Sequence, residues 1–284
     1  MAHPRVSSFV LVVVLLLAFG CSKKHKKVVA LTNQGIRLLD TRATEESRQK
    51  FEQALAIDNN YASAHYHMGI ALHFERKLDR AVFHLRRATE IERDNVHAWY
   101  RLGKVHVDLG NLDDAETAFR QALRWDSEHA PSYFERAELL RQADDYSGAD
   151  ELYRAAIRSD PRTSKAFRRL ASMYSRAGYL DLSVSVLTEG KRVNPEAIGL
   201  KNDLGVNLVR LGRYNEAISW LQQALGPDEP MARFNLAVAL LRKGQIRDGA
   251  GQLKKFVRLG ERDKRVDPDY LRTAKRVLRQ TRGR

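Results

Sequence analysis

The chain of 284 residues is strongly basic, with 49 Lys and Arg against 35 Asp and Glu and a formal net charge of +14. Its 17 glycines and 7 prolines are too few for a collagen-like or low-complexity protein, and its 43% hydrophobic content excludes a wholly disordered one. The single cysteine excludes an internal disulfide and a metal site made of several cysteines. The composition therefore indicates a folded chain with surplus basic charge.

The N-terminus carries an apolar run that is too short to cross a membrane. Residues 9–19 are eleven consecutive apolar residues, whereas a transmembrane helix needs about 20. Arg5 precedes the run, and Gly20 and Cys21 follow it. This order of basic, apolar and small residues is typical of a secretory signal peptide.

The end of this run, Leu17-Ala18-Phe19-Gly20-Cys21, resembles the lipobox of bacterial lipoproteins, in which a small residue precedes a lipidated cysteine. The resemblance implies a signal peptide over residues 1–20 and an acylated Cys21 that begins the mature chain. A basic linker follows over residues 21–27, and Ser22, in place of aspartate, favours the outer membrane. The alternative is an ordinary signal peptide cleaved elsewhere, which leaves Cys21 incidental.

One pattern of small and large apolar residues recurs through the rest of the chain, with an interval of 34 residues. Each copy has a small residue, a second small residue twelve positions later and a large apolar residue four positions after that. Apolar residues within each copy recur at helical spacing, which predicts two helices per copy. The leading small residues are Gly35, Gly69, Gly103, Ala137, Ala171 and Gly205, and Ala237 follows after 32 residues. The large residues are Phe51, Leu85, Phe119, Tyr153, Leu187, Leu221 and Leu253.

This pattern resembles the tetratricopeptide repeat. The resemblance extends to an aromatic residue four positions before the first small one, as in Trp99, and to a closing proline, as in Pro161. It covers residues 28–260 and implies an all-α, right-handed α-solenoid of about seven helix-turn-helix repeats. Because one repeat cannot bury its apolar face alone, stacked neighbours supply the core. Glycines 110, 178, 212 and 244 fall in the turns between paired helices, where a positive φ is accessible to glycine.

Residues 261–284 are predicted to form a basic capping helix and tail. Asp267-Pro268-Asp269 is typical of a helix start, and Leu271, Ala274 and Leu278 would form its apolar stripe. Residues 242–284 hold 15 basic and 5 acidic residues, whereas residues 28–241 hold 29 and 30. The basic end could meet an acidic partner, anionic lipid or only solvent. No nucleic-acid-reading motif is present, so we expect no nucleic-acid partner.

The family resemblance also implies a concave groove lined by the first helix of each repeat. Exposed aromatic rings with polar neighbours suit peptide binding, although the same rings could pack against adjacent helices. An apolar stretch around Phe234 and Val238 could receive a helix from a partner or the chain's own final helix. The Lys and Asn pair with which chaperone-binding members grip a C-terminal carboxylate is missing. The predicted groove residues are Tyr66, His73, Tyr100, Lys104, Phe134, Arg141 and Phe234.

No constellation for catalysis is found in the sequence. There is no G-x-S-x-G, no H-E-x-x-H and no glycine-rich phosphate loop. Seven of the nine histidines lie between His65 and His129, and we interpret them as packed or solvated rather than as metal ligands. We therefore expect no enzyme, no catalytic or metal-binding residues and no cofactor.

These features predict a scaffold protein of the bacterial cell envelope, lipid-anchored, with its repeats facing the periplasm. Its expected partners are envelope proteins, bound as a peptide or helix in the groove, and the membrane, reached through the lipid anchor. The architecture is similar to that of the pilotins that help secretin pores of type IV pili or secretion systems to assemble. The alternatives are a periplasmic adaptor for peptidoglycan enzymes or proteases, and a ligand-binding or enzymatic solenoid.

Overall fold

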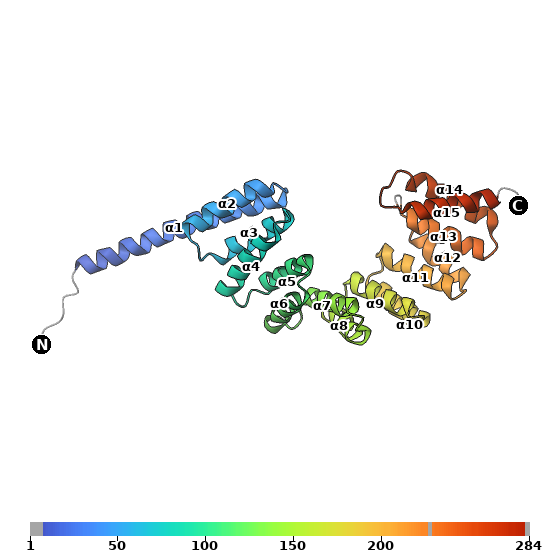
Figure 1. The fold of residues 1–284 in the computed structure, drawn as a ribbon, viewed down its shortest axis with the longest axis horizontal. Coiled ribbons are helices and arrows are strands. Elements are labelled where there is room, and N and C mark those ends of the chain that lie inside the picture. The colour runs from blue at the N-terminus through green and yellow to red at the C-terminus, as the bar shows by residue number, and fades with distance from the viewer. Residues whose placement is uncertain (1–7, 227–228, 282–284) are drawn as a thin grey trace. The chain divides into compact units, whose positions relative to one another are not determined.

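The computed structural model describes residues 8–226 and 229–281, with side chains described from residue 23 onward. This part of the chain contains fifteen helices and no strand (Figure 1). The first helices of the pairs are α1 (Ser8–Asp40), α3 (Ala62–Phe74), α5 (Val96–Leu109), α7 (Ala130–Gln142), α9 (Ser164–Arg176), α11 (Ile198–Arg210) and α13 (Pro230–Arg242). The second helices are α2 (Thr44–Ile57), α4 (Leu78–Ile91), α6 (Leu112–Trp125), α8 (Tyr146–Ser159), α10 (Leu180–Val193), α12 (Tyr214–Gln223) and α14 (Ile246–Gly260), and α15 (Pro268–Thr281) follows.

The predicted all-α repeat architecture is confirmed. Seven helix pairs are followed by one final helix, at the positions that the 34-residue pattern predicts. The second helix of a pair also packs against the first helix of the next pair, as α4 does with α5 and α10 with α11. Each repeat thus buries its apolar face against its neighbours, as expected for a solenoid.

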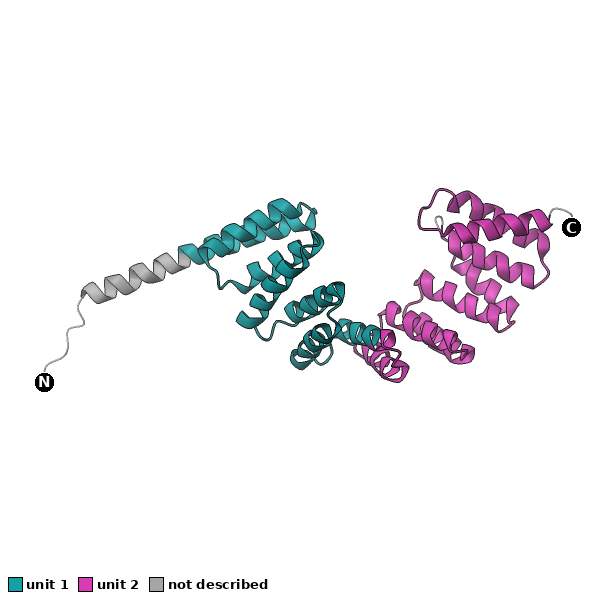
Figure 2. Cartoon of the chain, viewed as in Figure 1, with its two compact units in different colours: residues 1–139 teal, residues 140–284 magenta. Residues whose placement is uncertain are grey.

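The chain divides into two compact units, residues 1–139 and residues 140–284 (Figure 2). The boundary lies inside α7, within the single repeat region expected from the sequence. α1 also runs without a break through the predicted border at residues 27 and 28. Among the described residues, no helix has the length and apolarity that crossing a membrane requires.

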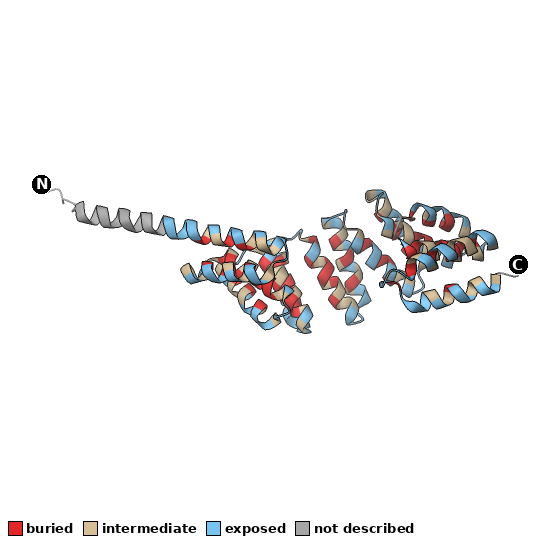
Figure 3. Cartoon of the chain, turned by 90° about the horizontal axis from the view of Figure 1, so that it is seen from above, coloured by how far each residue is buried: buried red, intermediate tan, exposed pale blue. Residues whose placement is uncertain are grey.

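The core of each repeat depends on the small residue of the first helix. A Cβ added to Gly103 would lie 2.5 Å from Cε1 of Phe119, and one added to Gly69 would lie 2.5 Å from Cγ of Leu85. Both large side chains are fully buried. Figure 3 shows the buried positions on the helix faces that turn toward neighbouring helices. Glycine at this position therefore lets the paired helices approach until the large side chain fills the space above it.

The turn between paired helices has a left-handed residue at the same position in all seven repeats. The predicted glycines adopt positive φ angles, from 76° at Gly212 to 90° at Gly244. Three repeats have no glycine there, and Arg42, Arg76 and Asp144 take φ angles of 60–61° instead. The left-handed conformation is thus a property of the turn that these side chains also accept.

The C-terminal cap is built as the sequence predicts. The Asp267 carboxylate accepts a hydrogen bond from the Asp269 backbone amide at 2.8 Å and so caps the start of α15. Ala274 of α15 packs with Phe256, which replaces the alanine of other repeats and is fully buried. The larger side chain at residue 256 therefore packs against α15 rather than against a further repeat.

We predict that Gly103→Ala lowers the free energy of unfolding by about 1–3 kcal/mol, because the added methyl group overlaps the buried ring of Phe119. Gly251→Ala is the matched control, since no atom lies within 4 Å of its added Cβ. This control should raise stability by up to about 1 kcal/mol through helix propensity. Chemical denaturation of the full chain measures both values. Equal effects of the two variants would contradict the proposed packing role.

We also predict that Gly178→Ala lowers stability by about 1 kcal/mol for a purely conformational reason. Gly178 has a φ of 86°, and no atom lies within 4 Å of an added Cβ. Arg42→Ala at the equivalent turn should change stability by less than about 0.5 kcal/mol, because Arg42 already has a Cβ. A comparison of the two denaturation midpoints checks this, and a larger loss for Arg42→Ala would be evidence against it.

Candidate functional site

The candidate site lies in the second unit, where the first helices of three successive repeats lie side by side. α11 contacts both α9 and α13. Arg210 of α11 donates a hydrogen bond from Nη1 to the Ser175 carbonyl oxygen of α9 at 2.9 Å. Asn235 of α13 donates from Nδ2 to Oδ1 of Asn202 of α11, also at 2.9 Å. Equivalent positions of the three repeats therefore line up across one face.

This face is hollowed by three adjoining cavities, which we together call the unit 2 groove. The first has a volume of about 720 Å³ and lies along α8 and α9, the second of about 610 Å³ lies along α9 and α11, and the third of about 500 Å³ lies along α11 and α13. Arg169 and Ser172 line both the first and the second cavity, and Val206 lines both the second and the third. The shared residues make the three cavities continuous.

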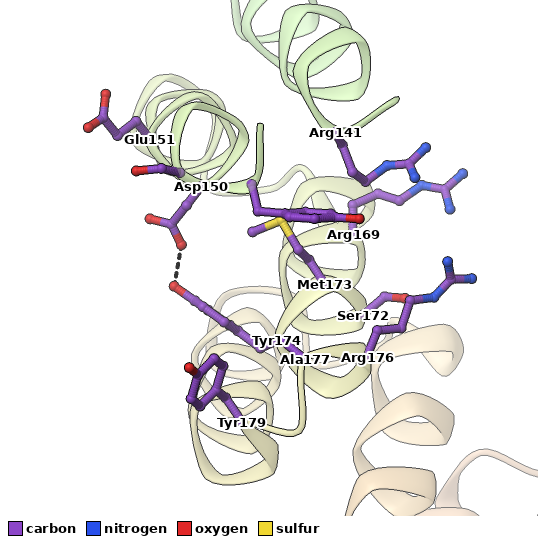
Figure 4. Close-up of a pocket in the computed structure, with 12 residues that line it drawn as sticks. Arg141, Asp150, Glu151, Arg169, Ser172, Met173, Tyr174, Arg176, Ala177 and Tyr179 are labelled. Atoms are coloured by element: carbon purple, nitrogen blue, oxygen red, sulfur yellow. Dashed lines mark hydrogen bonds between the residues drawn. The ribbon is translucent and has the colours of Figure 1, made fainter. Parts of the chain in front are cut away.

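Charges of opposite sign lie on opposite sides of the first cavity. Figure 4 shows the guanidinium groups of Arg141, Arg169 and Arg176 directed to one side, with Asp150 on the other. The Asp150 carboxylate accepts hydrogen bonds from Arg154 Nε at 2.8 Å and from the Tyr174 hydroxyl. Burial, together with this bond, raises the pKa of Tyr174. The acidic side of the cavity is thus already hydrogen-bonded within the protein.

The floor of the groove changes from polar to apolar along the repeats. One repeat position is occupied successively by Ser172, Val206 and Val238. Beside it, Arg168 Nε lies 2.6 Å from Asp203 Oδ2 in the second cavity. At the far end, Phe234 packs edge to face against Tyr270 of α15, with ring centroids 5.0 Å apart. A segment bound here would therefore meet polar groups first and apolar groups last.

The structure corrects the expectation for Phe134. Its side chain is only 5% exposed, so it belongs to the interior of α7 and offers no ring to a groove. Tyr100 is half-buried and packs against Phe119 and His129, and burial, with the nearby Glu135 carboxylate, raises its pKa to about 12. Tyr66 likewise packs against the buried cluster around Phe51. These rings serve the core, the alternative that the sequence left open.

The two polar residues predicted in the first unit form ion pairs between successive repeats. Lys104 Nζ lies 2.9 Å from Glu135 Oε2, and His73 Nε2 lies 2.9 Å from Asp108 Oδ2. The bond from His73, followed by Arg76, lowers the pKa of the Asp108 carboxyl group. These side chains hold neighbouring helices together, and a role in partner binding remains a prediction.

Two of the predicted residues line the unit 2 groove. Arg141 lines the first cavity and Phe234 the third. The third cavity also shows that the chain's own final helix partly covers the apolar stretch around Phe234, through Tyr270. The side chain of Cys21 lies outside the described residues, so its lipidation remains a prediction.

Sequence reasoning missed three arginines of the groove. Arg176, Arg210 and Arg242 occupy one repeat position in the last turns of α9, α11 and α13, and all three are exposed. The signal was present in the 34-residue register. Only two positions of the first helix were followed through every repeat, and the arginine position was not one of them.

Comparison with known proteins agrees with this architecture. Models described as "Tetratricopeptide repeat" match residues 74–134, 134–192 and 202–264. The chain belongs to the tetratricopeptide repeat family. Among solved tetratricopeptide folds, *Pseudomonas aeruginosa* PilF is similar with a TM-score of 0.60 and 16% identity, over 76% of this chain and 97% of that one. Yeast Tom70 is similar with a TM-score of 0.62 and 17% identity, over 91% of this chain and 55% of that one.

The relatives found by sequence are much longer proteins. Human protein O-mannosyl-transferase TMTC3 is 26% identical over 222 residues, which are 69% of this chain and 24% of that protein. Mouse superkiller complex protein 3 is 23% identical over 226 residues, which are 76% of this chain and 14% of that protein. The chain thus spans a quarter or less of the length of these relatives, and the likeness is to their tetratricopeptide-type repeats.

The histidines of this tetratricopeptide repeat protein are packed side chains within the first unit. His65 is 2% exposed, and its Nε2 lies 3.0 Å from the Asn59 carbonyl oxygen, which can only accept a proton. His65 Nδ1 is therefore the acceptor in its 2.9 Å contact with His84 Nδ1. Burial, with the neighbouring His65 and Arg80, lowers the pKa of His84 to about 4. Within the described part of the chain, no cluster of side chains suits a metal ion.

We predict that this histidine pair makes the protein less stable in acid. Because the folded-state pKa of His84 lies below the unfolded value of about 6.5, its contribution is complete above pH 6.5 and is lost as pH falls toward 4. His84→Gln keeps a hydrogen-bond donor without titrating there, so its melting temperature should fall less between pH 7.5 and pH 4.5. Parallel falls in the two proteins would contradict the assignment.

Proposed function

We propose that the protein is a membrane-anchored, non-enzymatic scaffold of the bacterial envelope that binds a segment of a partner protein in the unit 2 groove. The observation that supports this most directly is the continuity of the three cavities across α9, α11 and α13. Tetratricopeptide repeat proteins use such faces for protein–protein interaction. An elongated groove with mixed polar and apolar lining suits an extended chain better than a compact small molecule.

The chemistry of the groove supports a peptide as its occupant. Ser172 and the cavity-lining Arg176 are exposed, and Val206 and Val238 are half-buried. A peptide backbone can accept hydrogen bonds from arginines while its apolar side chains displace water from the valines. The ion pair between Arg168 and Asp203 crosses from α9 to α11 and keeps the two helices in register. The site is therefore formed before a partner arrives.

Anchoring at Cys21 supports the envelope part of the proposal. The lipobox-like sequence ends at the chain's only cysteine, and four lysines follow within residues 23–27. Two or more acyl chains on Cys21 would hold the protein stably on a membrane, and the lysines would add attraction to anionic headgroups. An anchored groove keeps its partner segment near the membrane surface.

Assembly of a secretin, pilus or secretion machine is the specific role that we propose within this function. The fold similarity to *P. aeruginosa* PilF, over 97% of that chain, is its support in the comparisons. A periplasmic adaptor for peptidoglycan enzymes or proteases would use the same groove and anchor. The identity of the captured partner separates the two roles.

The test is crosslinking in intact envelopes of the source bacterium, followed by affinity purification of the full chain. Ser172→Trp places an indole in the groove, and Ser185→Trp places the same residue on the exposed surface of α10 in the same repeat. We predict that wild type and Ser185→Trp recover the same partner, that Ser172→Trp loses at least nine-tenths of it, and that Cys21→Ser leaves the membrane fraction.

Each part of the proposal can fail separately in this experiment. Recovery of the partner by Ser172→Trp would overturn the groove as the binding site. Retention of Cys21→Ser on membranes would overturn lipid anchoring. Circular dichroism and melting of both tryptophan variants show whether a loss of binding reflects unfolding, since both substitutions are at exposed positions.

A further inference from the structure

We infer that the partner segment is acidic and extended, with carboxylates that contact Arg176, Arg210 and Arg242 in turn. This inference rests on the proposed function, because it specifies what the unit 2 groove binds. The three arginines are separated by 34 and 32 residues, the spacing of the repeats themselves. They therefore recur once per repeat along the groove, one each on α9, α11 and α13.

These arginines carry charge that the described part of the protein does not neutralise. Arg176 and Arg242 form no ion pair with any described residue, and Arg210 donates hydrogen bonds only to the carbonyl and hydroxyl oxygens of Ser175. Neutral acceptors satisfy a guanidinium geometrically but leave its charge in place. A carboxylate can add a charge-assisted, two-point hydrogen bond to such a group.

The carboxylates that line the groove do not cancel this charge. Asp203 is paired with Arg168, and Asp150 is paired with Arg154. Glu151 is exposed on α8, across the first cavity from Arg176 (Figure 4). The groove thus keeps a basic edge formed by one cation per repeat.

The equivalent position in the first unit has a different character. The corresponding residues there are Asp40, Phe74 and Asp108. Asp108 is hydrogen-bonded to His73 and Arg76, and no cation recurs in the register. The basic edge is therefore specific to the second unit and is not a general consequence of a basic chain.

The spacing of the arginines restricts the conformation of the partner. Packed helices have axes about 8–10 Å apart, so successive arginines are separated by about that distance. A polyproline II segment rises about 3.1 Å per residue with three residues per turn, which places every third side chain on one face about 9.3 Å apart. A carboxylate at every third residue of such a segment matches the three arginines.

The apolar end of the groove adds a second requirement. Val206 and Val238 lie on the floor beside Arg210 and Arg242, and Phe234 lines the same cavity. Apolar residues between the acidic ones would reach this floor. The inferred ligand is accordingly an acidic, proline-tolerant segment with apolar side chains, and not a free C-terminal carboxylate.

The test uses three synthetic peptides of about 12 residues that share length and fluorescent label. In the first, Glu stands at every third position among Pro, Leu and Ala. The second has the same composition with all Glu at one end, and the third has Lys in place of Glu. Fluorescence anisotropy with the full chain should show tightest binding for the spaced peptide, at least fivefold weaker binding for the grouped one and none for the Lys one.

The matched variants separate the arginine edge from general basicity. Arg176→Gln/Arg210→Gln/Arg242→Gln removes three charges from the groove, and Lys254→Gln/Lys255→Gln/Arg258→Gln removes three from exposed positions on α14. We expect at least a tenfold loss of affinity for the spaced peptide in the first variant and less than a twofold loss in the second. Salt should weaken wild-type binding more than binding by the groove variant.

The outcomes also distinguish failure of this inference from failure of the proposed function. Equal losses in the two triple variants, or equal binding of the spaced and grouped peptides, would overturn the arginine edge. If the groove variant then still failed to capture the envelope partner, the groove would stand and only its acidic specificity would be wrong. Capture by both that variant and Ser172→Trp would overturn the groove itself.

Discussion

The close approach of the paired helices is the constraint on which the rest of the structure depends. It exists because a small residue in the first helix receives a large apolar side chain from the second, as Gly103 receives Phe119 and Gly69 receives Leu85. Every repeat has the same contact in the same register, so every first helix presents the same positions to the same face. The alignment of groove residues across α9, α11 and α13 follows from this packing and from the direct contacts between these helices.

The division of the groove face into interior and surface depends on the size of the side chain at each aligned position. Large aromatic side chains such as Phe134 and Tyr100 gain more from burial between helices than from exposure, so they become part of the packing. Arginines at the ends of the first helices cannot be buried without a partner and remain at the surface. The binding character of the second unit is therefore set by its charged residues more than by its aromatic rings.

The fold could be predicted from the sequence almost entirely, because repetition makes local patterns redundant. Seven copies of one spacing specify the helices, the glycine turns and the capping helix that begins at Pro268. The candidate site could be predicted only in part. Position alone does not show whether Phe134 is buried or whether Lys104 has a carboxylate partner in Glu135. The left-handed conformation of Arg42, Arg76 and Asp144 also needed the structure, because the sequence marks that turn only where glycine occupies it.

The shortened interval between the sixth and seventh repeats shows where this architecture tolerates insertions and deletions. α12 has 10 residues, whereas the other second helices have 14 or 15, and the interval from Gly205 to Ala237 is two residues short. Arg242 nevertheless occupies the same place in α13 that Arg210 has in α11. Changes in length can therefore accumulate in the segments between repeats during evolution while the residues of the binding face keep their order.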